Sequence, residues 1–141
     1  MGFSLIAASA IVGASMLVAL SVLTGGILPS ITDFRDSYTE MKERAVERVQ
    51  TDIDVFIATT SPNASNYDLN FTINNTGSKT LDAGDFTVLI NGTNQVFSCS
   101  KPYIYLEGSA FVYVYNLNGT GLKKLKIVAG NGISAYYEYA V

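Results

Sequence analysis

The feature that most constrains this chain is its opening stretch, which contains no charged side chain from Met1 to Thr32. Residues 3–28 would form an α-helix roughly 39 Å long, and the hydrocarbon core of a bilayer is roughly 30 Å thick. A secretory signal would start with Lys or Arg and end after a shorter apolar region. No other segment is large enough to bury a helix that is apolar on every face. The stretch therefore predicts a transmembrane helix or the core helix of a filament.

Small residues recur four positions apart within this run: Ser9 and Gly13, Ala10 and Ala14, Ser15 and Ala19, Ser21 and Gly25. This spacing allows two helix backbones to approach closely in lipid. We therefore expect association between helices here, with Ser9, Gly13, Ala10 and Ala14 as the packing residues.

The end of the run contains Gly25, Gly26 and Pro29. Proline removes a helix hydrogen bond and clashes with the preceding turn. The sequence therefore predicts a kink or short break between residues 25 and 30.

A second helical pattern spans residues 33–52. The apolar positions are three or four residues apart and form one stripe: Ile31, Phe34, Tyr38, Met41, Ala45 and Val49. Charged residues fill the other faces. Two interpretations stay open: a solvated helix whose apolar side docks on its own domain, or a stalk that continues the membrane helix and packs on a second copy.

From Ile53 the period of apolar residues changes to two, which indicates β-strands. The strands are expected within these segments: 53–58, 67–74, 86–91, 96–100, 103–106, 111–116, 125–129 and 133–140. Turn signals separate them, at 61–63, 75–78, 91–92, 118–121 and 131–132. The chain thus divides into a hydrophobic helix and stalk, residues 1–52, and an all-β domain, residues 53–141. An immunoglobulin-like sandwich is the expected architecture of that domain, with a small closed barrel as the alternative.

Composition argues against an enzyme. The chain has no histidine and one cysteine, Cys99, which excludes the usual zinc sites and histidine-activated nucleophiles. Asp82 and Asp85 flank a turn, where aspartates usually bond to their own backbone. A net charge of −3 and a small lysine group in residues 123–126 do not suggest a nucleic-acid surface. We expect no catalytic residues, no metal and no cofactor.

The most frequent chemical motif is the N-glycosylation acceptor Asn-x-Ser/Thr. It occurs at five asparagines: Asn63, Asn70, Asn74, Asn91 and Asn118. Three lie in expected turns and two on the polar side of an expected strand, so all five are expected to be exposed. Glycosylation requires that a chain has crossed a membrane, so these motifs favour placing the β domain outside the cell.

The chain also resembles a known family, accessory protein F of the archaellum (FlaF, also called ArlF). The resemblance lies in the opening Met1-Gly2-Phe3-Ser4 before a small-residue helix, in Met41-Lys42-Glu43, in Asn75-Thr76-Gly77 and in residues 81–86. It implies an archaeal membrane protein with one membrane-spanning helix and an immunoglobulin-like domain beneath the surface layer. It also implies that the protein binds the surface-layer protein, works with other archaellum accessory and motor proteins, and helps to anchor the motor.

Archaellins and pilins share the plan of a helix followed by a sandwich, so a filament subunit is the alternative function. Such proteins normally carry a Lys/Arg-Gly cleavage site before the helix, and this sequence shows none. Strand edges and tyrosines are typical of interfaces, since tyrosine offers contact area with a polar tip. The candidate interface residues are Tyr103, Tyr136, Tyr137 and Tyr139. They could instead cover the sandwich or pair two copies of the chain.

Overall fold

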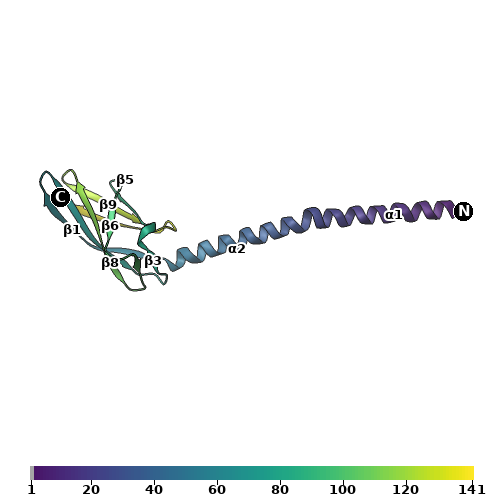
Figure 1. The fold of residues 1–141 in the computed structure, drawn as a ribbon, viewed down its shortest axis with the longest axis horizontal. Coiled ribbons are helices and arrows are strands. Elements are labelled where there is room, and N and C mark those ends of the chain that lie inside the picture. Colours follow the sequence, from purple (N-terminus) through teal and green to yellow (C-terminus); the bar gives the residue numbers. More distant parts are fainter. Residues whose placement is uncertain (1) are drawn as a thin grey trace. The chain divides into compact units, whose positions relative to one another are not determined.

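The computed structural model describes residues 2–141. It divides into two compact units, one ending at Glu43 and one comprising Arg44–Val141. The first unit is helical, and the second contains all the strands (Figure 1). The expected order of hydrophobic helix, charged helix and β domain is confirmed.

The apolar run and the charged helix that follows it form one helical segment of three parts. Helix α1 (Gly2–Val22) leads into a π-helical turn (Leu23–Ile27), and α2 (Leu28–Gln50) follows. The predicted irregularity takes the form of this π-helical turn, in which the Leu28 N–H donates to the Leu23 carbonyl five residues earlier. The wider turn falls at the glycine pair before Pro29, where the α-helical hydrogen bond of residue 29 is missing. The helix therefore continues instead of breaking.

Three serine hydroxyls in this run are bonded within the helix, which makes them compatible with an apolar surrounding. Ser9, Ser15 and Ser21 each donate to the carbonyl three residues earlier, at 2.9, 2.8 and 3.2 Å. No residue of α1 is buried in the single chain. Within residues 2–141, this helical segment is long and apolar enough to cross a membrane by length and composition.

Placing arginine at Val18, near the centre of the apolar run, should disfavour membrane insertion by about 2.5–3.5 kcal/mol, because a guanidinium would enter the hydrocarbon core. Alkaline washing of membranes should then release much of the Val18→Arg chain and none of a Val18→Leu control. Full retention of the Val18→Arg chain would show that residues 3–28 are not the anchor.

The β unit is built from two four-stranded antiparallel sheets. One sheet has the order β1 (Ile53–Asn63), β2 (Asn66–Asn75), β8 (Ser109–Leu117) and β6 (Phe97–Cys99). The other has the order β10 (Ser134–Ala140), β9 (Leu122–Val128), β4 (Thr87–Ile90) and β5 (Thr93–Gln95). A third pairing joins two short strands, β3 (Leu81–Asp82) and β7 (Tyr103–Ile104). Two separate sheets mean a sandwich, and the barrel alternative is wrong.

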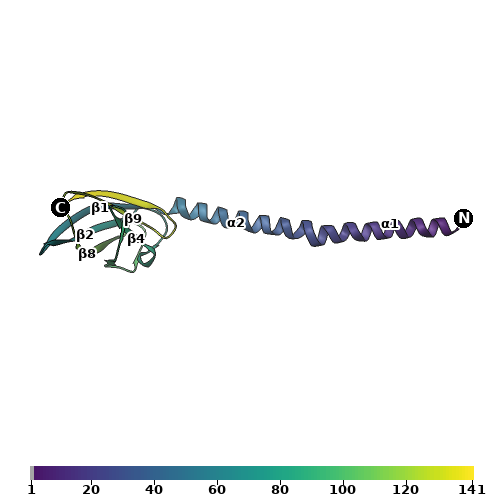
Figure 2. The same ribbon diagram turned by 90° about the horizontal axis from the view of Figure 1, so that it is seen from above.

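The strands of the two sheets are drawn in Figure 2. One apolar core lies between the two sheets. Strand β2 contributes Leu69, Phe71 and Ile73, alternating with half-buried polar residues, as its sequence predicts. Strand β9 contributes Leu125 and Ile127 from the facing sheet. Because every second residue of a strand points to the same side, the alternation along β2 identifies the face of that strand which is buried.

The first hairpin differs from the sequence expectation. Residues 61–63 were expected to form a turn, but β1 continues through Pro62, and the turn falls at Ala64 and Ser65. Strand β1 is an edge strand, so the missing N–H of proline need not leave a ladder bond unmade. The predicted hairpin at Asn91 and Gly92 is confirmed: both have positive φ, 49° and 84°, as a type I′ turn requires.

The last helical turn is built into the sandwich through the Asn75-Thr76-Gly77 turn. The N–H groups of residues 76 and 77 donate to the Asp52 carbonyl, and those of residues 78 and 79 donate to the Gln50 carbonyl. A side chain on Gly77 would lie 2.5 Å from the Asp52 nitrogen and the Gln50 oxygen, so only glycine fits there. The bonds to Gln50 satisfy the last carbonyl of α2, which a helix C-terminus leaves unpaired. We propose that the independently folding domain begins near Arg44, upstream of the boundary between residues 52 and 53.

A second set of contacts holds the same helical turn. The Asn131 side chain donates to the Thr51 hydroxyl at 2.7 Å, and Thr51 itself is buried. Lys79 forms an ion pair with Glu47. The helix end and the sandwich are therefore linked by side chains as well as by backbone.

Candidate interaction surfaces

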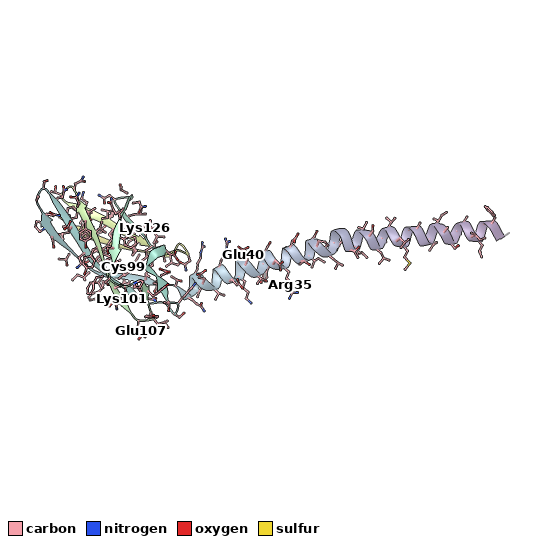
Figure 3. All side chains as sticks on the ribbon, viewed as in Figure 1. Arg35, Glu40, Cys99, Lys101, Glu107 and Lys126 are labelled. Atoms are coloured by element: carbon pink, nitrogen blue, oxygen red, sulfur yellow. The ribbon has the colours of Figure 1, made fainter. Side chains whose placement is uncertain are left out.

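The two outer faces of the sandwich differ in chemistry. The outer face of sheet β10-β9-β4-β5 is charged: Lys124 pairs with Glu138 at 3.1 Å, and the Lys126 ammonium lies 5.1 Å from the ring centre of Tyr136. Lys126 is labelled in Figure 3. Such a mixed-charge face is typical of a solvated surface.

The outer face of sheet β1-β2-β8-β6 is uncharged over its centre and carries a row of exposed apolar side chains. We call this group the aromatic face; it consists of the exposed Ile57, Phe111 and Tyr115 and the half-buried Tyr113. Phe111 is 49% exposed and Tyr115 is 60% exposed. The rings of Tyr113 and Tyr115 are nearly parallel, with centroids 6.4 Å apart. Exposed apolar groups of this kind mark interaction sites in soluble domains.

Strand pairing places these residues side by side. Ile57 lies opposite Thr72, and Thr72 lies opposite Phe111 on its other side. Asn70 lies opposite Tyr113, which in turn lies opposite Ser98. The aromatic face thus spans three strands of one sheet and is bordered by hydroxyl and amide groups.

The aromatic face was not predicted from the sequence. Residues 111–115 alternate aromatic rings with valines, so both sides of strand β8 are apolar, and alternation alone does not tell which side is buried. The structure buries Val112 and Val114 and leaves the rings outside. The signal was present, because an antiparallel sandwich buries only one side of each strand, and a strand apolar on both sides must expose one of them.

Ile57 reaches this face through an irregularity. The simple alternation of residues 53–58 puts Ile57 on the core side with Ile53 and Val55, and that expectation is wrong. The register of β1 against β2 shifts between Val55 and Ile57. A β-bulge inserts one extra residue and reverses the side to which later residues point.

Two of the predicted interface tyrosines are available on the surface. Tyr136 is exposed on β10, and the adjacent Lys126 side chain lowers the pKa of its hydroxyl. Tyr103 is exposed on β7, which pairs with β3. They belong to different sheets, so the strand pairings do not bring them together.

The other two predicted interface tyrosines are less accessible. Tyr139 is only 5% exposed, and its hydroxyl lies 3.0 Å from that of Tyr67. Burial, together with this hydrogen bond, raises the pKa of Tyr139. Tyr137 is half-buried and packs against the core. Tyr139 is therefore a core residue, because β10 directs it and Ala135 inward.

The five glycosylation motifs have unequal exposure. Asn63, Asn91 and Asn118 are exposed, as expected. Asn70 and Asn74 are half-buried and therefore less exposed than predicted, because they lie on β2, in the middle of a sheet. The side-chain oxygen of Asn70 is fully covered and makes no hydrogen bond within residues 2–141. The prediction that all five are exposed is thus wrong for these two.

Asn70 also pairs with Tyr113 of the aromatic face. A glycan on Asn70 would cover this face and block a protein from docking there. Modification of Asn70 and use of the aromatic face are therefore alternatives, whereas modification of the three exposed turn asparagines is compatible with docking.

The four predicted helix-packing residues, Ser9, Ala10, Gly13 and Ala14, are all exposed in the single chain. Gly13 has open space around its Cα, with no atom within 4 Å of an added Cβ. A partner helix in the membrane could therefore approach this side, and its presence remains a prediction.

Asp82, one of the side chains considered for catalysis, has a structural role. The Asp82 side chain accepts a hydrogen bond from the Gly84 N–H at 2.8 Å, as expected of a turn aspartate. Asp82 and Asp85 line a polar cleft of about 450 Å³ with Glu47 and Lys79. Among residues 2–141 no three metal-ligating side chains gather. Cys99 is half-buried against the core.

The fold defines a class: an immunoglobulin-like β-sandwich that follows an apolar helix of membrane-spanning length. No family model matches the sequence. An uncharacterized protein of Archaeoglobus fulgidus is 30% identical over 106 residues, which are 74% of this chain and 63% of that protein. The chain therefore spans less than two thirds of this relative's length.

Two solved structures share the fold. The archaellum periplasmic stator protein FlaG from Sulfolobus acidocaldarius has a TM-score of 0.55 and 16% identity, covering 63% of this chain and 99% of that chain. The archaellum periplasmic stator protein complex of FlaF and FlaG, also from Sulfolobus acidocaldarius, gives 0.51 and 17%, covering 62% of this chain and 87% of that chain. The predicted sandwich is thereby confirmed, and the similarity does not single out FlaF.

Proposed function

We propose that this chain is a membrane-anchored, non-enzymatic component of an archaellum stator. The observation that carries the proposal is the match in fold between this chain and nearly the whole of the solved chain of a stator protein, FlaG. The apolar helix adds the means of attachment to a membrane. The resemblance of the sequence to FlaF points to the same machine.

In this function the apolar helix lies in the archaeal cell membrane, and the sandwich lies outside, beneath the surface layer. Two observations support this placement. The run from residue 2 to residue 32 has no charge that would oppose insertion, and three glycosylation motifs are exposed on the sandwich. The FlaG relative in fold is itself described as periplasmic.

The sandwich binds the surface-layer protein and thereby anchors the motor. The aromatic face is the surface best suited to this contact, because large apolar rings supply most of the binding energy of typical interfaces. Its centre is free of charge, so binding does not require desolvating an ion. Tyr103 and Tyr136 are the competing contact residues, and other archaellum accessory proteins are further partners.

We expect the double variant Phe111→Ala, Tyr115→Ala to weaken binding of the surface-layer protein by about 30-fold or more, which corresponds to about 2 kcal/mol for loss of the central aromatic anchors. The measurement is capture of surface-layer protein by the immobilised full-length chain in detergent. Tyr103→Ala, Tyr136→Ala serves as the matched pair, removing two exposed tyrosine rings elsewhere. Unchanged circular dichroism and thermal melting of both variants would show that the sandwich is intact.

The outcomes separate the candidates. Loss of capture with the tyrosine pair alone would move the contact to Tyr103 and Tyr136. No capture by the unmodified chain, together with fibres of purified full-length protein in electron micrographs, would replace the anchoring function with the filament-subunit alternative.

A further inference from the structure

Turns from both sheets meet at the end of the sandwich to which β1 leads from the end of α2. We call this the distal end; it consists of residues 63–66, 91–93 and 118–121. Tyr67, which follows the first of these turns, pairs with Leu117, which precedes the third. Asn91 and Asn118 line one cleft of about 310 Å³. The three exposed glycosylation motifs therefore gather at one end of the domain.

Two of these motifs are the same tripeptide in the same kind of turn. Residues 91–93 and 118–120 both read Asn-Gly-Thr, and all six residues are exposed. Each asparagine comes directly after the last residue of a strand. The glycines at positions 92 and 119 have φ of 84° and 94°, which glycine adopts without strain. Both motifs are thus presented to solvent in tight turns.

The atom that receives a glycan is the side-chain nitrogen of asparagine, and at these two motifs it is available. The side-chain oxygen of Asn91 accepts a hydrogen bond from the Lys124 N–H at 2.9 Å, which fixes the side chain and leaves its nitrogen outward. Within residues 2–141, neither the Asn91 nitrogen nor the Asn118 side chain takes part in a hydrogen bond. An enzyme can reach both nitrogens without breaking a bond of the folded domain.

The other three motifs are engaged in the fold. The Asn63 nitrogen lies 3.3 Å from each carboxylate oxygen of Asp68 and donates to them. Asn70 and Asn74 are half-buried on β2, which is paired on both sides. Modification there would require the loss of a hydrogen bond to a charged group or the opening of a central strand.

We propose that the chain is N-glycosylated at Asn91 and Asn118 and at none of the other three motifs. The donor is a saccharide linked to a lipid phosphate. The asparagine nitrogen bonds to carbon C1 of the saccharide, and the bond from C1 to the phosphate oxygen breaks. The lipid phosphate leaves with the electron pair, and the amide proton passes to a base of the transferase. Glycans at both positions would cover the distal end with bulky, soluble groups.

This inference rests on one part of the proposed function, that the sandwich lies outside the cell. The test is peptide mapping by mass spectrometry of the full-length chain, purified from membranes of an archaeal host that N-glycosylates its surface proteins. Chymotrypsin cuts after Phe, Tyr and Leu, which lie between each pair of neighbouring motif asparagines. We expect glycan mass on the peptides that contain Asn91 and Asn118, and none on the other three.

Variants assign each glycan to its motif. Asn91→Gln and Asn118→Gln should each remove one glycan, and the double variant should migrate on a gel as the unmodified chain does. Thr93→Val and Thr120→Val are matched controls, since they keep the asparagine and remove only the hydroxyl that the motif requires. Each should lose the glycan of its own motif and keep the other.

One further variant tests why Asn63 is passed over. Asp68→Ala removes the carboxylate to which the Asn63 nitrogen donates, so Asn63 should then gain a glycan. If Asn63 stayed unmodified in this chain, selection by hydrogen bonding would be wrong. A glycan on Asn70 or Asn74 of the wild-type chain would overturn the selection by burial.

A labelling experiment separates failure of this inference from failure of the proposed function. Val96 is 92% exposed and lies outside all five motifs. In a Cys99→Ser chain, Val96→Cys should react with a membrane-impermeant maleimide on intact cells. Labelling without glycans on Asn91 and Asn118 would refute the inference and leave the external placement standing. Labelling only after lysis would refute both.

Discussion

Replacing Asn75 with alanine is expected to lower the free energy of unfolding of the sandwich by about 3–4 kcal/mol, because several buried hydrogen bonds are lost at once. Asn75 is 1% exposed. Its side-chain amide donates to the carbonyls of Lys79, Ile104 and Tyr105 at 2.8, 3.0 and 3.2 Å. Its side-chain oxygen accepts from the Gly77 N–H at 3.1 Å. Alanine would leave these groups without the amide, and water has little access to them.

The measurement is thermal unfolding of the full-length chain in detergent, followed by the β-sheet circular dichroism signal. A loss of about 3–4 kcal/mol corresponds to a fall in melting temperature of roughly 12–30 °C for a domain of this size. Asn74→Ala is the matched control, since Asn74 is the preceding residue and points to the outer face. It should change stability by about 0.5 kcal/mol or less.

Asn75→Asp sharpens the test. It keeps the shape of the side chain but removes the amide donors, and its carboxylate would face carbonyl oxygens. It should destabilise the sandwich at least as much as Asn75→Ala. Melting temperatures of the Asn75 variants that matched the Asn74 control would show that this network does not hold the turn to the rest of the domain.

Replacing Phe71 with alanine should have a comparable or larger effect, about 3–5 kcal/mol, because it leaves a cavity in the core. Phe71 is 0% exposed and lies on β2, which is paired on both sides. Neighbouring core side chains come from both sheets, so the space cannot close without moving one sheet. Urea unfolding of the full-length chain in detergent, followed by circular dichroism, measures the loss.

The matched control is Phe111→Ala, which removes the same side chain from the aromatic face. It should reduce stability by less than about 1 kcal/mol, since half of that ring is already in water. Phe71→Ala and Phe111→Ala thus separate folding from binding: the first should unfold the domain, and the second should weaken capture of the surface-layer protein. An equal loss of stability in both would mean that the outer face is packed against something within the chain.

Local physics explains most of what the sequence predicted correctly. A run without charge predicts a helix that is apolar on all sides, and α1 is such a helix. The change of period at Ile53 marks the first residue of β1. The Asn91-Gly92 pair predicts a hairpin because both residues tolerate positive φ. Each of these features depends on residues that are neighbours in the sequence.

The errors arise where distant segments meet. Pro62 is tolerated inside β1 only because that strand is at the edge of a sheet, and the order of strands is not a local property. Tyr139 was predicted to lie on the surface, but in the folded domain it is buried and its hydroxyl is within hydrogen-bonding distance of the hydroxyl of Tyr67 on another strand. The aromatic face is exposed because Val112 and Val114, on the opposite side of β8, pack against the facing sheet in the core.

The sequence by itself determined the order of the parts, the helix and strand periods, the tight turns and the charge pattern of α2, because each depends on spacing along the chain. The tertiary structure decided which side of β8 is exposed, which tyrosines remain on the surface, and how the Asn75-Thr76-Gly77 turn binds the end of α2. Those outcomes depend on which groups the two sheets and the helix end bring within hydrogen-bonding or packing distance. Such pairings between distant residues are created only when the whole domain folds.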